Sequence, residues 1–384
     1  MPERPWGATG RERAQLHEDF VQLCRIRSVS GEERAIADHV SALLRELGHG
    51  VEEDDTAAQT RAGSGNLLCR IPGQAGRSVL LCAHLDTVPH AGQVEPVLDD
   101  GGWVSAGDTI LGADNKAALA VLLAVARRYA PAGGQRPPVG IELLLTVCEE
   151  VGLAGAKAFD CSRLASEFGY VYDHASPVGE LVMASPTYHR IEAHFRGRPA
   201  HAGIRPEDGR SAVLAASLAV AAMPFGRLDP ETTTNVGSIH GGVGGTNVVA
   251  EHCTVLAEAR SLSDVKVEAA VARIVDACHD AANDPRCACD VDIDVQRLFT
   301  GYRHTGTQPS VVAAEAALRA CGYEPKRILT GGGSDANAFQ AQGFACTNLA
   351  NGTERNHEPT ERVSTVALEG MLDVTHALLQ ELRG

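Results

Sequence analysis

The stretch IELLLTVCEE, residues 141–150, is an apolar run that leads directly into two adjacent glutamates, Glu149 and Glu150. Its apolar residues are continuous rather than alternating, as expected for a strand that is covered on both faces. Two neighbouring carboxylates at the end of such a strand repel each other. We therefore expect partners from elsewhere in the chain that offset this repulsion.

Strands of the same kind alternate with helical segments through the first half of the chain. Continuous apolar runs occur at residues 66–72, 78–86 and 170–175. Helical periodicity is seen over 116–130 and over about 13–48, where Ser-Gly-Glu-Glu at 30–33 predicts the cap of a second helix. This rotation of strands and helices predicts an α/β layered sandwich.

The pattern changes near residue 187. Alternation with period two begins there and indicates a sheet with one face exposed to water. It is seen in residues 188–197, 232–242, 253–262 and 289–299. Helices fit between these strands at 207–222 and 264–282. The order β-α-β-β-α-β predicts a ferredoxin-like α+β unit.

Beyond about residue 300 the first pattern returns. It comprises a helix at 308–321, a glycine-rich turn at 331–333, a strand at 345–350 and a final helix at 363–382. A chain of 384 residues is long enough for two domains. The sequence thus predicts one α/β domain, residues 1–186 and 300–384, interrupted by a second domain at residues 187–299.

Composition and charge argue against several classes of function. The formal net charge of −15 disfavours binding to nucleic acid or to an anionic membrane surface. No stretch approaches the ~18–20 apolar residues of a membrane span, and the N-terminal segment lacks the apolar core of a signal peptide. The 11 cysteines, an odd number with several inside apolar runs, favour reduced thiols over disulfides. These observations predict a cytoplasmic protein.

Acidic and histidine residues gather where the apolar runs end, which is where open α/β sheets bind ligands. They are His84, Asp86, Asp114, Glu149, Glu150, Asp173 and His357. Two histidines with three carboxylates suit a pair of divalent metal ions, with zinc favoured by the imidazoles and Co²⁺ or Mn²⁺ as alternatives. Two ions ~3.5–4 Å apart can hold a hydroxide between them and polarise a carbonyl.

The two adjacent glutamates can take different roles at such a centre. Successive side chains of an extended backbone point to opposite sides. Glu150 can bind a metal ion while Glu149 faces the bridging water as general base and later returns the proton to the leaving amine. Asp86, two residues after His84, can accept the other ring N–H of that histidine. Asp114 is central enough in the sequence to bridge the two ions.

Several motifs, in this order, resemble the M20 family of di-zinc peptidases and amidohydrolases. They are HLDTVP (84–89), GADNKAALA (112–120), EEVGLAGA (149–156) and GRPAHAG (197–203). TGGGSDAN (330–337), followed by NLANGTERNHEPTE (348–361), resembles most closely the peptidase T-like, tripeptide aminopeptidase branch. The resemblance covers nearly the whole chain. It implies a zinc-aminopeptidase-like α/β/α catalytic domain with an inserted lid and dimerisation domain, which is here the ferredoxin-like unit.

The resemblance also implies a ligand for each coordination position. One metal ion is implied on His84, Asp114 and Asp173, and the other on Asp114, Glu150 and His357. Glu149 matches the general base, Asp86 matches the acid that orients the histidine, and a cis peptide is implied at Asp114–Asn115. The tail HEPTE departs from the HTT-E common in the branch, and His174 stands where relatives carry a small residue, so the choice of substrate stays open.

The lid domain carries the residues that the resemblance assigns to substrate binding. His201 matches a histidine that stabilises the oxyanion of the tetrahedral intermediate and that reaches a neighbouring subunit in many relatives, so a homodimer through the lid is expected. Asn247 and Arg260 match positions that bind the substrate carboxylate. Gly332, Gly333 and Ser334 are expected to line the pocket through backbone amides. As simpler alternatives, His201 could cap the following helix and Arg260 could pair with an acidic neighbour.

The combined prediction is a hydrolase that cleaves short peptides, as an aminopeptidase acting on tripeptides. Within the same superfamily, an N-acyl-amino-acid or carbamoyl amidohydrolase or a carboxypeptidase is the alternative, because the same two ions cut any amide. A two-metal phosphate esterase requires a basic clamp that the ligand stretches lack. A non-catalytic binding protein is disfavoured because the base and all the ligands are present.

Overall fold

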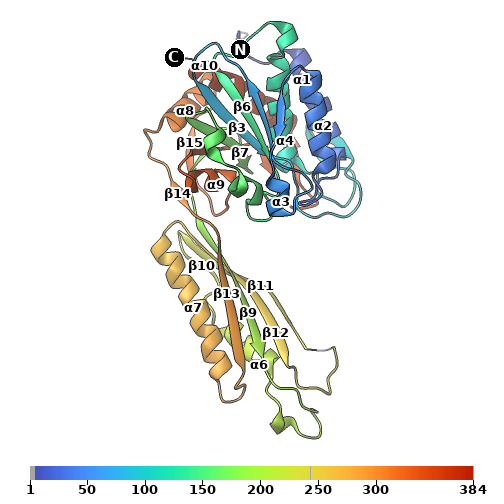
Figure 1. The fold of residues 1–384 in the computed structure, drawn as a ribbon, viewed down its shortest axis with the longest axis vertical. Coiled ribbons are helices and arrows are strands. Elements are labelled where there is room, and N and C mark those ends of the chain that lie inside the picture. Colours follow the sequence, from blue (N-terminus) through green and yellow to red (C-terminus); the bar gives the residue numbers. More distant parts are fainter. Residues whose placement is uncertain (1–4, 243, 384) are drawn as a thin grey trace. The chain divides into compact units, whose positions relative to one another are not determined.

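The computed structural model describes residues 5–242 and 244–383, which divide into two compact units (Figure 1). The first unit extends to Met183 and also contains Arg303–Leu329 and the chain from Ser334 onward. The second unit comprises Ala184–Tyr302 and Thr330–Gly333. The segment 330–333, which the sequence pattern assigns to the α/β domain, is thus grouped with the inserted unit.

The first unit is built on a sheet of nine strands in the order β1-β2-β6-β3-β7-β16-β8-β14, with β15 paired to β8. The strands are β1 (Val51–Glu53), β2 (Leu67–Ile71), β3 (Ser78–His84), β6 (Gly140–Thr146), β7 (Phe168–His174), β8 (Glu180–Ser185), β14 (Tyr302–Arg303), β15 (Lys326–Leu329) and β16 (Ala345–Ala350). Strand β3 runs parallel to β6 and β7, and β16 runs parallel to β7. The carboxyl ends of these four central strands therefore lie at the same end of the sheet.

Helices lie on both faces of this sheet (Figure 1). They are α1 (Gly10–Arg25), α2 (Arg34–Glu46), α3 (Thr56–Thr60), α4 (Ala113–Arg128), α5 (Ala154–Ala158), α8 (Pro309–Cys321), α9 (Asp335–Ala341) and α10 (Thr365–Glu381). Leu81 and Ala83 of β3 share one hydrophobic core with α4, α8 and α10, whereas the intervening Leu80 and Cys82 are buried outside that core. The continuous apolar run of β3 is thus explained by burial on both faces, and the predicted fold class is confirmed.

A small antiparallel sheet of four strands also belongs to the first unit. Its order is β17 (Thr353–Glu354), β18 (Arg362–Ser364), β5 (Gly102–Ser105) and β4 (Pro96–Asp99). The sequence does not predict this sheet, because its strands are two to four residues long and come from distant parts of the chain. The sheet is important for the site because the loop between β17 and β18 carries His357.

The second unit is a five-stranded antiparallel sheet in the order β10-β11-β12-β9-β13. Its elements are β9 (Thr187–Arg196), α6 (Ala212–Ala222), β10 (Gly226–Asp229), β11 (Thr232–Gly241), β12 (His252–Ser261), α7 (Asp264–Asn283) and β13 (Asp290–Phe299). Ile191, Ala193 and Phe195, alternate residues of β9, form a core with the two helices. Apart from the extra strand β10, this is the predicted ferredoxin-like order, with one sheet face buried and the other partly exposed.

The predicted cap of the second helix does not form. The residue before α2 is Glu33, and its side chain makes no capping hydrogen bond to that helix. Its buried carboxylate instead accepts the backbone N–H groups of Gly31, Gly63 and Cys148. Ser30 donates its hydroxyl to Asp86 at 2.7 Å. The contacts with Gly63, Asp86 and Cys148, which are distant in the sequence, replace the local capping bonds that the sequence pattern predicts.

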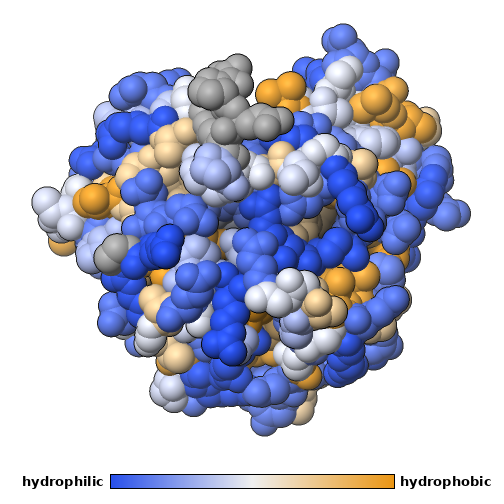
Figure 2. Space-filling view, turned by 90° about the horizontal axis from the view of Figure 1, so that it is seen from above, coloured by the Kyte–Doolittle hydropathy of each residue, from blue (hydrophilic) through white to orange (hydrophobic). Residues whose placement is uncertain are grey.

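The surface and the cysteines agree with the composition. Figure 2 shows a face on which hydrophobic residues are scattered among hydrophilic ones. All 11 cysteines are free thiols, and only Cys161 is more than slightly exposed. Among the described residues, no helix has the length and apolar character needed to cross a membrane.

Glu12 and Arg128 form an ion pair that is expected to make the stability of the protein sensitive to acid. Partial burial raises the pKa of Glu12, but hydrogen bonds from Arg128 and Thr9 outweigh it and lower the pKa from 4.5 to about 2. The pair therefore stabilises the folded state above about pH 4.5, and this contribution is lost as the pH falls toward 2. After allowance for solvent screening, we expect it to be worth ~2 kcal/mol at pH 7.

The test is urea unfolding of Glu12→Gln, with Glu18→Gln, an exposed position on the same helix, as the matched control. Glu12→Gln should lower the free energy of unfolding at pH 7, and the deficit should shrink between pH 4.5 and the acid limit of folding. A deficit that is the same at pH 7 and pH 3 would show that the pair contributes through packing rather than charge.

Candidate metal centre

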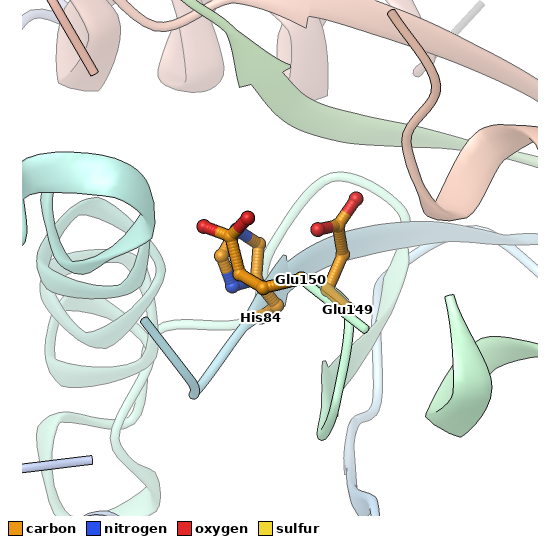
Figure 3. A group of neighbouring side chains, drawn as sticks. All are labelled: His84, Glu149 and Glu150. Carbon is orange, nitrogen blue, oxygen red and sulfur yellow. The ribbon is translucent and has the colours of Figure 1, made fainter. Parts of the chain in front are cut away.

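The candidate site lies where the central parallel strands end. His84 is the last residue of β3, Asp173 is the next-to-last residue of β7, and Glu149 and Glu150 follow β6 after two further residues. Because β3 pairs in parallel with β6 and with β7, the carboxyl ends of these three strands lie side by side. Figure 3 shows the carboxylate of Glu150 over the ring of His84 and that of Glu149 turned to one side.

Two further residues reach this site from outside the sheet. Asp114 lies in the first turn of α4 with non-helical angles, φ −84° and ψ 101°, and the Asp114–Asn115 peptide is cis. His357, between β17 and β18, has φ 70°, in the left-handed region that residues other than glycine rarely adopt. A left-handed backbone at a residue other than glycine is concentrated at functional sites, where the surrounding structure holds it in place.

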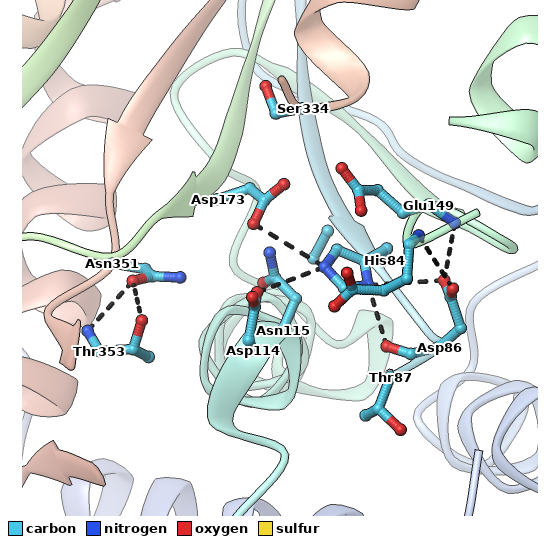
Figure 4. Close-up of polar contacts among 12 residues, drawn as sticks. His84, Asp86, Thr87, Asp114, Asn115, Glu149, Asp173, Ser334, Asn351 and Thr353 are labelled. Atoms are coloured by element: carbon cyan, nitrogen blue, oxygen red, sulfur yellow. Dashed lines mark hydrogen bonds and ion pairs between the residues drawn. The ribbon is translucent and has the colours of Figure 1, made fainter. Parts of the chain in front are cut away.

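The structure brings the five predicted ligands together as two sets that share Asp114. Figure 4 labels the first of these sets, His84, Asp114 and Asp173. In the first set, His84 Nε2 lies 3.4 Å from Asp114 Oδ1 and 3.8 Å from Asp173 Oδ1. In the second set, His357 Nε2 lies 3.3 Å from Asp114 Oδ2 and 3.0 Å from Glu150 Oε1. In each set the ligand atoms lie within 4.8 Å of one another. One carboxylate oxygen of Asp114 thus faces each set, as a bridging ligand requires.

A third grouping joins His84 and Glu150 with Glu149. Glu149 is therefore near the ligands, but it is not a member of either set that contains Asp114. The two sets account for all five predicted ligands without it. Its buried carboxylate is left beside the centre as a group that can exchange protons.

The electrostatics of the cluster suit a bound cation. Burial, and next the charge of Asp173, raise the pKa of Glu149. Hydrogen bonds to Asp114 and Glu150 raise the pKa of His357 to about 10, so that its protonated ring partly neutralises the carboxylates. Asp114 Oδ1 is buried and has no hydrogen-bond partner among the described residues. A buried oxygen that makes no hydrogen bond, with the ring nitrogen Nε2 of His84 3.4 Å away, and a group of crowded carboxylates both fit a divalent metal ion.

Asp86 supports the site mainly through the backbone. Its side chain accepts the N–H groups of Glu149 at 3.0 Å and Glu150 at 3.2 Å. The Nδ1 atom of His84 lies 3.0 Å from the main-chain oxygen of Asp86 and 3.5 Å from its carboxylate. The nearer acceptor for the histidine is thus the carbonyl of Asp86, and not its side chain, which is the acceptor expected from the sequence.

Asn348 of β16 holds Asp173 in place, a contact that the sequence gives no sign of. Its side-chain oxygen accepts the N–H of Asp173 at 3.0 Å, and its side-chain amide donates to the carbonyl of the same residue at 2.9 Å. His174 turns to Ser176, with 2.8 Å between Nδ1 and the hydroxyl. Successive side chains of a strand point to opposite faces of the sheet. This alternation is the only sequence signal that Asp173 and His174 lie in different surroundings.

In the second unit, the structure brings His201 and Asn247 into neighbouring segments. His201 forms a backbone bridge with Val248, and the N–H of Ala202 donates to the carbonyl of Asn247 at 2.9 Å. His201 does not cap the following helix, because α6 is capped by the hydroxyl of Ser211. Both predicted residues are exposed.

Arg260 is already paired within the second unit. Its Nε and Nη2 atoms donate to the carboxylate of Glu258 at 3.1 Å each, and Nη1 donates to the carbonyl of Gly331 at 3.3 Å. The guanidinium carbon lies 4.1 Å from the ring centre of Tyr188. The fork thus lies over an aromatic ring and is occupied by a carboxylate, which agrees with the simpler alternative of an acidic neighbour.

Two of the three amides predicted to line the pocket have internal partners. The N–H of Gly332 donates to the hydroxyl of Thr330 at 3.0 Å, and that of Ser334 donates to the side chain of Asn337 at 3.1 Å. A Cβ added to Gly333 would lie 2.3 Å from the ring of Phe299. The glycine at this position is therefore explained by close packing within the second unit.

Comparison with known proteins agrees with this architecture. Residues 187–285 match the family model described as a peptidase dimerisation domain of the M20 type, and residues 66–171 match peptidase family M28. The aminopeptidase PepT of Bacillus cereus is 36% identical, with a TM-score of 0.84 over 97% of this chain and 99% of that one. A tripeptidase of Staphylococcus aureus is 31% identical, with a TM-score of 0.89 over 97% and 98%. The uncharacterised protein YqjE of Bacillus subtilis is 36% identical over 96% of this chain and 98% of its own length.

The matches to peptidase family models and to two solved peptidases of this fold identify the chain as a peptide hydrolase. Three of these relatives match over nearly the whole length of both chains, and these matches identify the family as well as the class of enzyme. The chain belongs to the M20 peptidase family, in its peptidase T-like branch.

Proposed function

We propose that the protein is a two-metal aminopeptidase that releases the N-terminal residue of short peptides, with tripeptides as its preferred substrates. The observation that carries this proposal is the pair of ligand sets that share Asp114 and leave Glu149 outside both. The names of two similar proteins, an aminopeptidase PepT and a tripeptidase, support the choice of substrate.

His84 and Asp173 would hold one divalent ion, Glu150 and His357 the other, and Asp114 both. Imidazole nitrogens and carboxylate oxygens in this proportion favour Zn²⁺, with Co²⁺ or Mn²⁺ as substitutes. When bound, such a pair polarises the scissile carbonyl and makes a water molecule nucleophilic at neutral pH. Asp86 and Asn348 keep the ligands in register by fixing the backbone of Glu149, Glu150 and Asp173.

Glu149 acts as the general base in this proposal. A carboxylate oxygen of Glu149 takes a proton from the attacking water and later delivers it to the amine nitrogen that leaves. Burial and the nearby charge of Asp173 raise its pKa, which brings the group closer to the range in which it can both accept and return a proton. Its N–H is held by Asp86, so the side chain projects from a fixed backbone.

Residues of the second unit would bind the remainder of the peptide. His201 would donate to the developing oxyanion, and Asn247 and Arg260 would bind the C-terminal carboxylate. The flat guanidinium of Arg260 on Tyr188 suits a two-pronged contact with a carboxylate. Because Glu258 occupies the fork, the substrate carboxylate would have to replace it or share it. The match to a dimerisation domain supports a homodimer through this unit, which sedimentation of the full chain can test.

The test of this function is the turnover of a small substrate panel by the Zn²⁺-loaded protein. The panel contains a free-amine tripeptide, the matching dipeptide, the N-acetylated tripeptide and an N-acyl amino acid. We expect the free-amine tripeptide to be cleaved with a kcat/KM at least tenfold above that of every other member. Cleavage of only the blocked substrates would instead identify an amidohydrolase, and release of the C-terminal residue would identify a carboxypeptidase.

A further inference from the structure

Glu361 is a buried carboxylate that neither ligand set contains, and it lies against the bridging ligand. Glu361 is only 1% exposed to solvent. One carboxylate oxygen, Oε1, accepts the N–H of Asp114 at 2.9 Å, and the other, Oε2, accepts the N–H of Gly112 at 2.7 Å. No cation lies within ion-pair distance of it among the described residues, and its hydrogen-bond donors are backbone N–H groups.

These two contacts compensate for a missing cap. The residue before α4 is Gly112, which has no side chain to satisfy the first N–H groups of that helix. Glu361 provides an acceptor from a segment 247 residues away in sequence. Because Asp114 has non-helical angles, its backbone is not held in the regular geometry of the helix. The carboxylate of Glu361 therefore holds the backbone from which the bridging ligand projects.

The same residue also anchors the loop that carries His357. Its N–H donates to the carbonyl of Glu358 at 3.0 Å, which closes a turn directly after His357. The next residues form β18, which pairs with β5. On the other side of the loop, at the start of β17, the side chain of Asn351 accepts both the N–H and the hydroxyl of Thr353 (Figure 4). The loop is thus fixed at both ends, and Glu361 ties its second end to α4.

We propose that Glu361 is a positioning residue that sets the distance between Asp114 and His357 and so assembles the metal site formed by Asp114, Glu150 and His357. The inference rests on the proposed two-metal function. The other site depends on it less, because His84 and Asp173 lie on paired strands and Asn348 fixes the backbone of Asp173. Removing the carboxylate of Glu361 should therefore weaken the site with Glu150 and His357 more than the site with His84 and Asp173.

The test is metal titration of the metal-free full chain with Zn²⁺ by calorimetry, together with the absorption spectrum of the Co²⁺-loaded protein. Glu361→Gln keeps the shape of the side chain but replaces one acceptor oxygen by an NH₂ group, which faces a backbone N–H and cannot accept it. Changes next to metal ligands typically cost 10–100-fold in affinity. In Glu361→Gln we expect a loss of this size for one of the two ions. The affinity for the other ion should stay within about threefold of that of the original chain.

Two further variants make the result specific. Glu358→Gln alters an exposed glutamate of the same loop and should bind both ions as the original chain does. His357→Ala removes a ligand of the affected site directly and should lose the same ion as Glu361→Gln. If Glu361→Gln does not fold, Glu361→Asp, which keeps the charge with a shorter reach, should show the same selective loss to a smaller degree.

The outcomes separate this inference from the proposed function. An original chain that binds only one ion, or none, contradicts the two-metal function itself. If the original chain binds two ions and Glu361→Gln binds both equally well, Glu361 has no positioning role. Equal weakening of both ions in Glu361→Gln and Glu361→Asp would likewise overturn the proposal, because it would indicate general support of the fold.

Discussion

Glu149→Gln is expected to bind both metal ions and to lose nearly all turnover. Glutamine has the shape of glutamate but cannot take a proton from water at neutral pH, and the loss of a general base typically lowers kcat by ~10²–10⁴. Because Glu149 lies outside the two ligand sets that share Asp114, metal binding should change little. The measurements are kcat on a free-amine tripeptide and the number of ions bound per chain.

Glu150→Gln provides the matched comparison. The two glutamates are adjacent, and their N–H groups are bound by the same carboxylate of Asp86, so both changes disturb the backbone alike. Glu150→Gln should lose metal affinity together with activity, since Glu150 Oε1 belongs to the set with His357. Should Glu149→Gln retain more than a tenth of the original kcat, or should it be the variant that loses metal, the two roles are assigned wrongly.

Exhaustive chelation is expected to abolish activity, and added Zn²⁺, Co²⁺ or Mn²⁺ is expected to restore it. Chelation should also lower the midpoint of thermal unfolding, because the ions bind the folded centre and the remaining buried carboxylates repel one another. Burial already raises the pKa of Glu149, Glu150 and Asp173 in the absence of an ion. The measurements are tripeptide turnover and differential scanning calorimetry before chelation, after it, and after reconstitution.

Two controls separate these effects. Mg²⁺, which prefers an all-oxygen octahedral shell, should restore less activity than Zn²⁺ at equal concentration. The Glu149→Gln variant should show the same loss and recovery of thermal stability without recovery of turnover. Activity that persists in chelated protein shown to be metal-free would rule out the two-metal mechanism.

Much of the candidate site could be predicted from residues at strand ends. His84, Glu149 and Asp173 follow continuous apolar runs, and parallel pairing of β3, β6 and β7 brings such ends together whatever the details of packing. Asp114 and His357 come from a helix start and a loop. Both could be listed as candidate ligands from the sequence, and Asp114 could be proposed as the bridge from its central position. The assignment of each residue to a particular ligand set could be inferred only from the resemblance to a family.

The contacts that support the ligands could not be predicted, for a physical reason. Glu361, Asn348 and Glu33 act on backbone groups that are far away in the sequence. No local pattern marks a carboxylate whose partners are distant N–H groups. The same limit explains the failed cap before α2, where Glu33 is buried rather than exposed at the helix start. The short strands of the small sheet were missed because two to four residues carry too little periodicity.

The way in which the chain enters and leaves the second unit has a consequence for folding. The chain leaves the first unit after Met183 and returns at Arg303, where the N–H of His304 donates to the carbonyl of Met183 at 2.7 Å. Strands β8 and β14 are neighbours in the sheet at this point. If the second unit folded first, it would bring its own two ends together. The entropic cost of closing the long loop between β7 and β16 would then be smaller when these strands pair. The inserted unit would then shorten the search by which the ligand-bearing strands find one another.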